Sequence, residues 1–355
     1  MRNQSPLTNG RHAARRHPVP GHPARRHLAR RRPGRRLLAA TGLVAAACTA
    51  AAAGLAAAGP TTAAAAQPVL PVGYSFAAGF AAGVAFPQLP PPGANHSGCR
   101  PGRAHPYPVV LVHGTFENGN DNWRAAAPLL ANHGYCVFTF SYGGLVPSDP
   151  VQATGAIAAS ARQLAAFVGK VLAATGAAKV DLVGHSQGGM MPRYYIRFLG
   201  GAAHVAKLVA LAPSNYGTTV DGLGTLSGTL GPLSPLDLVF AVGCRACAQQ
   251  EPGSAFLARL NARPTVPGIR YTVIESTGDE VVTPYTNAFL PAAANVTDIT
   301  LQQQCARDHS DHLEISYDPV ALADVLNALD PAHPVQVPCL TVLPVTGPPG
   351  PVPSF

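Results

Sequence analysis

Charged and aromatic residues are scarce in this chain of 355 residues, at 12% and 6%, and it holds a single tryptophan. No acidic residue occurs in residues 1–66, although this segment holds 11 of the 25 lysines and arginines. Beyond it, the remaining 14 basic residues face all 17 acidic residues, which leaves a net charge of −3. The overall charge of +8 therefore comes from the N-terminal segment and gives no support for a nucleic-acid partner.

The N-terminal segment, residues 1–66, has the order of features that is typical of an export signal removed after transport. An arginine-rich stretch at 1–36 is followed by an Ala/Leu/Val run at 37–58 and by a small-residue cleavage site at 64–66. The arginine pair at 35–36 matches a twin-arginine signal weakly. A retained membrane helix is the alternative, which the weak hydrophobicity of alanine disfavours. We therefore expect a secreted protein.

Six cysteines follow this segment, and an even number in an exported chain favours three disulfides. Nearness in the sequence favours the pairs Cys99 with Cys136, Cys244 with Cys247, and Cys305 with Cys339. A zinc site that joins the C-x-x-C at 244–247 to Cys305 and His309 is the alternative. An oxidising compartment would close the C-x-x-C first, so we expect no metal.

Short β-branched runs alternate with helical runs from Pro108 onward, which predicts an α/β fold with a mostly parallel sheet and helices on both faces. Strands are expected at 109–112, 136–140, 180–183, 207–211, 270–275 and 296–301. Helices are expected at 123–132, 153–175, 187–199 and 319–329. Asp318 is the expected N-cap of the last helix, because Pro319 then takes the first helical position.

The 289 residues that follow residue 66 are enough for one buried domain, and we expect a monomer. The main domain is expected at 99–339, after an N-terminal extension at 67–98 and before a proline-rich tail at 340–355. Residues 213–262 break the α/β alternation and predict a lid-like insert over the carboxyl edge of the sheet. The glycine pattern at 222–228 has neither the spacing nor the preceding strand of a dinucleotide loop, so no cofactor is expected.

Residues 181–189 read DLVGHSQGG and place Ser186 at the centre of a G-x-S-x-G pattern. A β-branched strand precedes the pattern and a helical run follows it, which disfavours a chance match in a chain with 36 glycines. Gly184 and Gly188 stand where a side chain would collide with a strand that reverses into a helix. Ser186 is therefore the predicted nucleophile, and Pro192 is expected to kink the helix behind it.

A serine elbow needs an acid and a base, and these are expected after the serine in chain order. Asp279 follows the strand at 270–275 and so lies at the carboxyl end of the sheet, where it can hold an imidazole. Glu280 and Asp298 are the alternatives. Glu280 is adjacent but is expected to point elsewhere, and Asp298 lies inside a predicted strand. We predict Asp279 as the acid.

Two histidines compete for the role of the base. His312 precedes the apolar Leu313, which can anchor its loop, whereas His309 has only polar neighbours. We predict His312 as the general base. The oxyanion hole is expected to use the backbone N–H groups of Gln187 and Thr115, with His113 bracing the loop that carries Thr115.

Four segments together carry a family resemblance: VVLVHGTFENGNDNW, GHSQGGMMPRYYIRFLGG, STGDEVVTP and DHSDHLEISYDP. They resemble the secreted triacylglycerol lipases and esterases of actinobacteria, which belong to the α/β-hydrolase superfamily. The resemblance runs from about Cys99 to Cys339. It implies lipase or carboxylesterase activity on a lipid or small ester substrate at a lipid–water interface, with the triad and oxyanion hole on the residues predicted above.

Other functions would use the same residues. An acyltransferase or a polyester or amide hydrolase needs the same triad. A catalytically inactive extracellular binding scaffold is the alternative from another class, which the intact triad and oxyanion positions disfavour.

Overall fold

The computed structural model describes residues 68–146, 148–219 and 243–355. Six parallel strands form one sheet in the order β2-β1-β3-β4-β5-β6. The strands are β1 Val109–Val112, β2 Val137–Thr139, β3 Val180–His185, β4 Val205–Leu211, β5 Arg270–Glu275 and β6 Val296–Thr300. The predicted α/β fold is confirmed, since each expected strand is present and pairs in parallel. The expected export signal, the glycine pattern at 222–228 and the middle of the expected insert lie outside the described residues.

The central strands are buried on both sides, which explains their nearly continuous apolar sequences. Val183 of β3 pairs with Leu111 of β1 on one side and with Val209 of β4 on the other. The edge strand β6 reads VTDIT and is largely exposed. The apolar core therefore lies along β1, β3 and β4, and the carboxyl ends of these strands form one edge.

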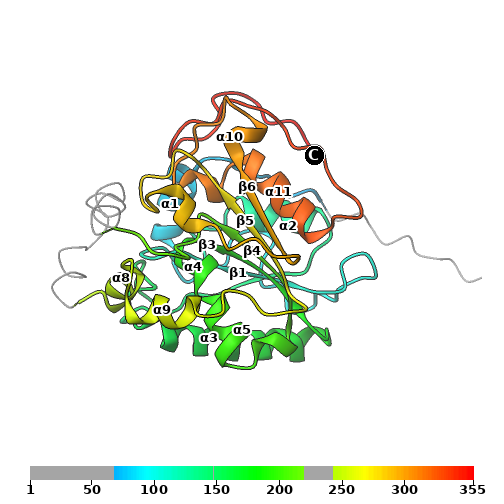
Figure 1. Ribbon diagram of the computed structural model, residues 1–355. Helices are drawn as coiled ribbons and strands as arrows, with labels where there is room; N and C mark the ends of the chain where they lie inside the picture. The colour runs from blue at the N-terminus through cyan, green and yellow to red at the C-terminus, as the bar shows by residue number, and fades with distance from the viewer. Residues whose placement is uncertain (1–67, 147, 220–242) are drawn as a thin grey trace, which may run out of the picture. The chain divides into compact units, whose positions relative to one another are not determined.

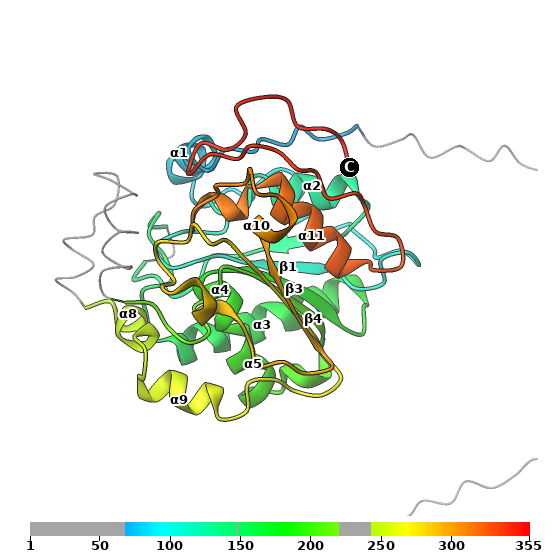
Figure 2. The same cartoon turned by 45° about the horizontal axis from the view of Figure 1, so that its top comes forward.

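Helices cover both faces of the sheet (Figures 1 and 2). One face carries α3 Ile157–Thr175 and α5 Pro192–Phe198, and the other carries α2 Ala126–Asn132 and α11 Pro319–Leu329. Helix α3 is long and apolar enough to cross a membrane by composition alone. It is a core helix, because Leu164 and Val168 are fully buried and Phe167 stacks on Phe140 with ring centroids 4.4 Å apart.

Apart from α1 Phe76–Ala85, the other helical elements of the described residues are short. They are α4 Gln187–Met190, η1 Gly201–Ala203, α8 Arg245–Gln250, α9 Ala255–Asn261, η3 Tyr285–Ala288, α10 Leu301–Gln304 and η4 Glu314–Ser316. Helices α8 and α9 lie in the described part of the expected insert.

Three expected helices have bounds that differ from those observed. The helix expected at 187–199 is divided into α4 and α5, because Pro192 has no N–H to continue the hydrogen bonds and begins a new helix. The helix expected from residue 153 begins at Ile157, since Ala153 has a φ of 59°. The helix expected from residue 123 begins at Ala126. The Asp318 N-cap is confirmed, because its side chain accepts the N–H of Val320 at 2.8 Å.

Helix α1, Phe76–Ala85, lies in the segment expected to be an extension, where no helix was predicted. Its glycines disfavour an isolated helix, but a Cβ on Gly79 would collide with the ring of Tyr317 and one on Gly83 with the backbone of Asp121. Phe76 is buried and meets Tyr317 edge to face. Tertiary packing therefore selects this helix.

Residues after Cys339 also pack on the domain. Val342 is fully buried, and its carbonyl accepts the N–H of His309 at 2.9 Å. The carbonyl of Val345 accepts the N–H of Ala77 at the start of α1. The two ends of the described chain thus meet beside the loop that carries His312.

Three disulfides join Cys99 to Cys136, Cys244 to Cys247, and Cys305 to Cys339, which are the expected pairs. The alternative zinc site is excluded for these cysteines, because each sulfur that it requires is bonded to another cysteine.

Candidate active site

The predicted site residues gather at the carboxyl edge of the sheet. Thr115 follows β1, Ser186 follows β3 and Asp279 follows β5. His312 lies in the loop between α10 and α11. Parallel strands end at one edge, so the topology brings groups together that lie up to about 200 residues apart in sequence.

Ser186 adopts a backbone conformation that few side chains tolerate. Its φ of 54° and ψ of −123° place it in the left-handed region, at a cost of roughly 1–3 kcal/mol that the surrounding structure must offset. Its N–H donates to Leu211 at 2.9 Å and its carbonyl accepts the N–H of Gly189 at 2.9 Å. A Cβ on Gly184 would collide with the carbonyl of Gly188. The sharp turn from β3 into α4 therefore explains the G-x-S-x-G pattern.

Asp279 and His312 form a buried hydrogen-bonded pair. His312 Nδ1 lies 2.7 Å from Asp279 Oδ2, and both side chains are fully shielded from solvent. The other carboxylate oxygen of Asp279 accepts the N–H groups of Val281 and Val282 at 2.7 and 2.8 Å. These two backbone donors fix the carboxylate, so that it orients the imidazole.

The pair shifts both pKa values in the directions that favour charge. Burial opposes charge on His312, but the negative charge and hydrogen bond of Asp279 outweigh it and raise the pKa of His312 above its ordinary value. Burial likewise opposes charge on Asp279, but His312 and the backbone donors lower the pKa of Asp279.

The second ring nitrogen of His312 is free to act. With Nδ1 donating to Asp279, Nε2 of the neutral ring carries a lone pair. Nε2 is buried and has no hydrogen-bond partner among the described residues, and no bond joins it to the Ser186 hydroxyl. Such bonds are often long until substrate is bound.

A second histidine–carboxylate contact, between His185 and Glu117, supports the loop that carries His312. His185 Nε2 donates to the carbonyl of His312 at 2.8 Å, while its Nδ1 lies 2.9 Å from Glu117 Oε2. Glu117 also accepts the N–H of Gly114 at 3.0 Å. The side chains of Glu117, His185 and His312 are all buried. His185 precedes Ser186 directly, so this contact holds the base close to the nucleophile. Sequence reasoning missed it, because no spacing rule connects residues 117 and 185.

The alternative acids and base lie differently. Glu280 Oε2 accepts the backbone N–H of His312 at 3.3 Å and makes no hydrogen bond to its ring. Asp298 is exposed on β6, and His309 is exposed with its backbone bonded to Val342. The imidazole of His312 therefore has Asp279 as its carboxylate partner.

Glu275 at the end of β5 is a further buried carboxyl group that the sequence did not single out. One of its oxygens accepts the N–H of Ser276 at 2.8 Å. Burial and the charge of Asp279 raise the pKa of Glu275 well above its ordinary value. A second negative charge on Glu275 beside Asp279 is therefore disfavoured.

The two residues expected to form the oxyanion hole lie side by side. The backbone N–H groups of Thr115 and Gln187 have no hydrogen-bond partner in the described part of the chain. The Thr115 hydroxyl donates to Gln187 Oε1 at 2.9 Å, which ties the two residues together. His113 braces the loop as expected, since its Nδ1 lies 2.8 Å from the carbonyl of Gly114. Burial lowers the pKa of His113 to about 4.

The parallel sheet, the helices on both faces and the strained serine turn define the α/β-hydrolase fold. The crystal structure of Aspergillus fumigatus lipase B is similar, with a TM-score of 0.53 and 19% identity. The similarity covers 70% of this chain and 57% of that one.

The model of the family described as Lipase (class 2) matches residues 106–322, and the chain belongs to this family. A triacylglycerol lipase of Pseudarthrobacter phenanthrenivorans is 43% identical over 93 residues, which is 25% of this chain and 27% of that protein. A triacylglycerol lipase of Burkholderia plantarii is also 43% identical over 93 residues, 25% of this chain and 24% of that protein. The aligned part spans about a quarter of the length of these curated relatives.

Proposed function

We propose that this protein is a serine hydrolase that cleaves carboxylic esters of lipids. The observation that carries the proposal is the strained Ser186 turn at the same sheet edge as the buried Asp279–His312 pair. Membership of the class 2 lipases and the 43% identity to two triacylglycerol lipases support a lipid ester as substrate.

The residues divide the reaction between them. Ser186 Oγ attacks the acyl carbonyl while His312 Nε2 accepts its proton, and Asp279 stabilises the imidazolium that forms. The N–H groups of Thr115 and Gln187 donate to the negative oxygen of the tetrahedral intermediate, and the loss of one such donor costs about 3 kcal/mol. His312 then protonates the leaving alcohol, and water releases the fatty acid from Ser186.

The protein acts outside the cell in this proposal. Residues 1–66 serve as the export signal, and residues 99–339 form the catalytic domain, which works as a monomer. The three disulfides support this location, because disulfides persist in oxidising compartments.

Hydrolysis of p-nitrophenyl esters of short and long acyl chains, and of emulsified triolein, tests the activity. Wild type is expected to cleave all three, and Ser186→Ala to lose roughly 10⁶-fold in kcat. Cleavage of short esters alone would reduce the proposal to an esterase. Dominant transfer to an added alcohol, or faster cleavage of amides, would replace lipid hydrolysis by one of the other triad reactions.

A further inference from the structure

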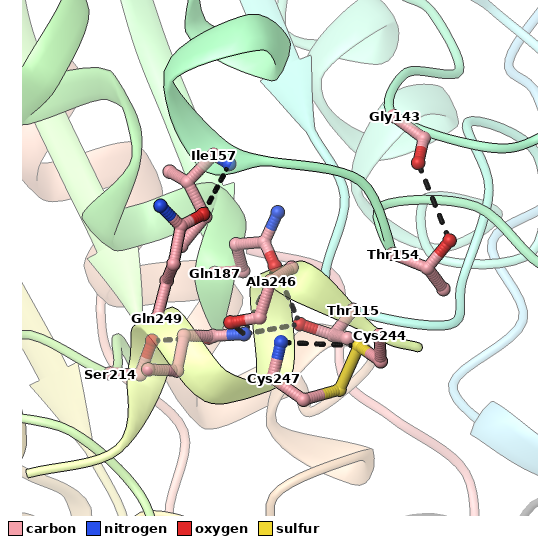
Figure 3. The surroundings of a disulfide bond; sticks show 11 residues. Thr115, Gly143, Thr154, Ile157, Gln187, Ser214, Cys244, Ala246, Cys247 and Gln249 are labelled. Atoms are coloured by element: carbon pink, nitrogen blue, oxygen red, sulfur yellow. Dashed lines mark hydrogen bonds between the residues drawn. A yellow bond between two sulfur atoms is a disulfide. The ribbon is translucent and has the colours of Figure 1, made fainter. Parts of the chain in front are cut away.

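Gln250, the last residue of α8, lies between the two expected oxyanion residues. Figure 3 shows Thr115, Gln187 and Ser214 beside the Cys244–Cys247 disulfide at the start of this helix. Gln250 Nε2 donates to Thr115 Oγ1 and to Gln187 Oε1, each at 3.0 Å. Thr115, Gln187 and Gln250 are all buried to within 1% exposure, so these hydrogen bonds lie away from water.

The orientation of the Gln250 amide is fixed by a backbone carbonyl, because Gln250 Nε2 donates to the carbonyl of Ala246 at 3.3 Å. Gln250 Oε1 accepts the hydroxyl of Ser214 at 2.7 Å. If the amide were reversed, its oxygen would face the carbonyl oxygen of Ala246, and two acceptors would meet without a hydrogen between them. Gln250 is therefore a donor toward the oxyanion residues.

This donor changes what the Thr115 hydroxyl can do. That hydroxyl has one hydrogen, which Gln187 Oε1 accepts in the structure. If the hydrogen turned toward a bound oxyanion without Gln250, Gln187 Oε1 would be left buried and unpaired, which is unfavourable. With Gln250 present, Gln187 Oε1 still accepts an N–H of Gln250 Nε2, and Thr115 Oγ1 accepts an N–H from the same nitrogen.

We propose that Gln250 is a positioning residue of the oxyanion hole, which frees the Thr115 hydroxyl to donate to the oxyanion. This rests on the proposed function. Gln250 itself touches no reacting atom. It acts by replacing the hydrogen bond that the Thr115 hydroxyl gives up to Gln187 Oε1.

Helix α8 is anchored well enough to carry such a group. The Cys244–Cys247 disulfide closes its first turn, and Cys244 Sγ accepts the N–H of Cys247 at 3.1 Å. The N–H of Ala246 donates to Thr154 at 3.1 Å, and Gln249 Oε1 accepts the N–H of Ile157 at 2.8 Å. Six residues would not hold a helix in isolation, so these ties fix the position of Gln250.

Steady-state kinetics of Gln250→Met on a soluble p-nitrophenyl ester test the proposal, with Gln163→Met, at an exposed position of α3, as the matched control. Methionine keeps the length of the side chain and removes the amide donor. We expect kcat of Gln250→Met to fall roughly 10- to 100-fold at an unchanged KM, because the donor acts in the transition state. The control loses the surface hydrogen bond in which Gln163 Oε1 accepts the N–H of Gly143, and its kcat is expected to stay within about twofold.

A double-mutant cycle separates positioning from a general structural effect. Thr115→Val removes the hydroxyl and keeps the backbone N–H. In this background Gln250→Met is expected to cost less than about twofold in kcat, since the group through which it acts is gone. The full loss in both backgrounds would overturn the proposal, as would an equal loss of kcat in the control. If Gln250→Met does not fold, Gln250→Asn replaces it, because its amide falls short of both acceptors.

Wild-type activity distinguishes a failure of the positioning role from a failure of the proposed function. Active wild type with an unchanged kcat in Gln250→Met overturns the positioning role and leaves the proposed function in place. Wild type that cleaves no ester overturns both.

Discussion

His312 and Asp279 titrate as one buried pair, and the sign of their coupling predicts how activity depends on pH. Burial favours the neutral imidazole, but the charge and hydrogen bond of Asp279 raise the pKa of His312 above its ordinary 6.5. Only the neutral ring can accept the Ser186 proton. Activity is therefore present above this pKa and lost as the pH falls through it.

The profile of kcat/KM against pH is expected to rise through one ionisation above pH 6.5. Asp279→Asn removes the charge that raises the pKa of His312, so this limb should move to lower pH while kcat falls by roughly 10⁴-fold. Asp298→Asn is the control, because Asp298 is exposed on β6 and distant in the sheet order from β3. An acid limb that stays in place in Asp279→Asn would show that Asp279 does not set the pKa of the base.

Single residues could be predicted from the sequence where a pattern fixes their geometry. The G-x-S-x-G pattern indicates Ser186 because only glycine fits beside the reversed strand, and chain order then points to Asp279 and His312. The structure places the latter two in contact. Glu117 and Gln250 were not predicted, because each acts through contacts between segments that no sequence spacing relates.

At the scale of elements, long apolar runs were predicted well and short polar ones were not. The strands are within about two residues of their expected bounds, since burial on both faces requires continuous apolar sequence. Helices α8 and α9 were missed because six or seven residues carry too little periodicity, and α8 depends on its disulfide and on ties to α3.

Removal of each of two disulfides should separate stability from activity. Cys244→Ser with Cys247→Ser opens a crosslink between residues 3 apart, and Cys99→Ser with Cys136→Ser one between residues 37 apart. Loop-closure entropy predicts losses of about 2 and about 4 kcal/mol in the free energy of unfolding.

The variant that loses less stability is expected to lose more kcat. The Cys244 and Cys247 double variant loosens the helix that carries Gln250. Because a displaced positioning group lowers the rate, its kcat is expected to fall about 10-fold. The Cys99 and Cys136 variant should keep its kcat. Urea unfolding and ester hydrolysis on the same samples measure both, and a kcat that follows stability in the two variants would contradict the account.

At the scale of the whole molecule, the segments before Cys99 and after Cys339 belong to the packed structure. Phe76 and Val342 are buried, and the N–H of Phe76 donates to Glu314 Oε2 at 3.0 Å. Burial raises the pKa of Glu314 to about 9, which favours its neutral form two residues after His312. Helix α1 thus helps to shield the loop of the base from water.

Phe76→Ala is expected to lower the free energy of unfolding by about 3–5 kcal/mol, because it leaves a cavity against Tyr317. Phe86→Ala is the matched control at the other end of α1, where the side chain is 60% exposed, and should change stability by less than about 0.5 kcal/mol. Urea unfolding measures both. Equal small effects would mean that α1 is not part of the cooperative core.

Labelling with a serine-reactive fluorophosphonate tests the central claim most directly, because it requires an activated serine and no particular ester. Wild type is expected to take up one label per chain, on the peptide that carries Ser186, and both Ser186→Ala and His312→Ala to lose it. Wild type that stays unlabelled while folded would contradict the account and favour a binding scaffold. Label that persists in Ser186→Ala would place the nucleophile elsewhere.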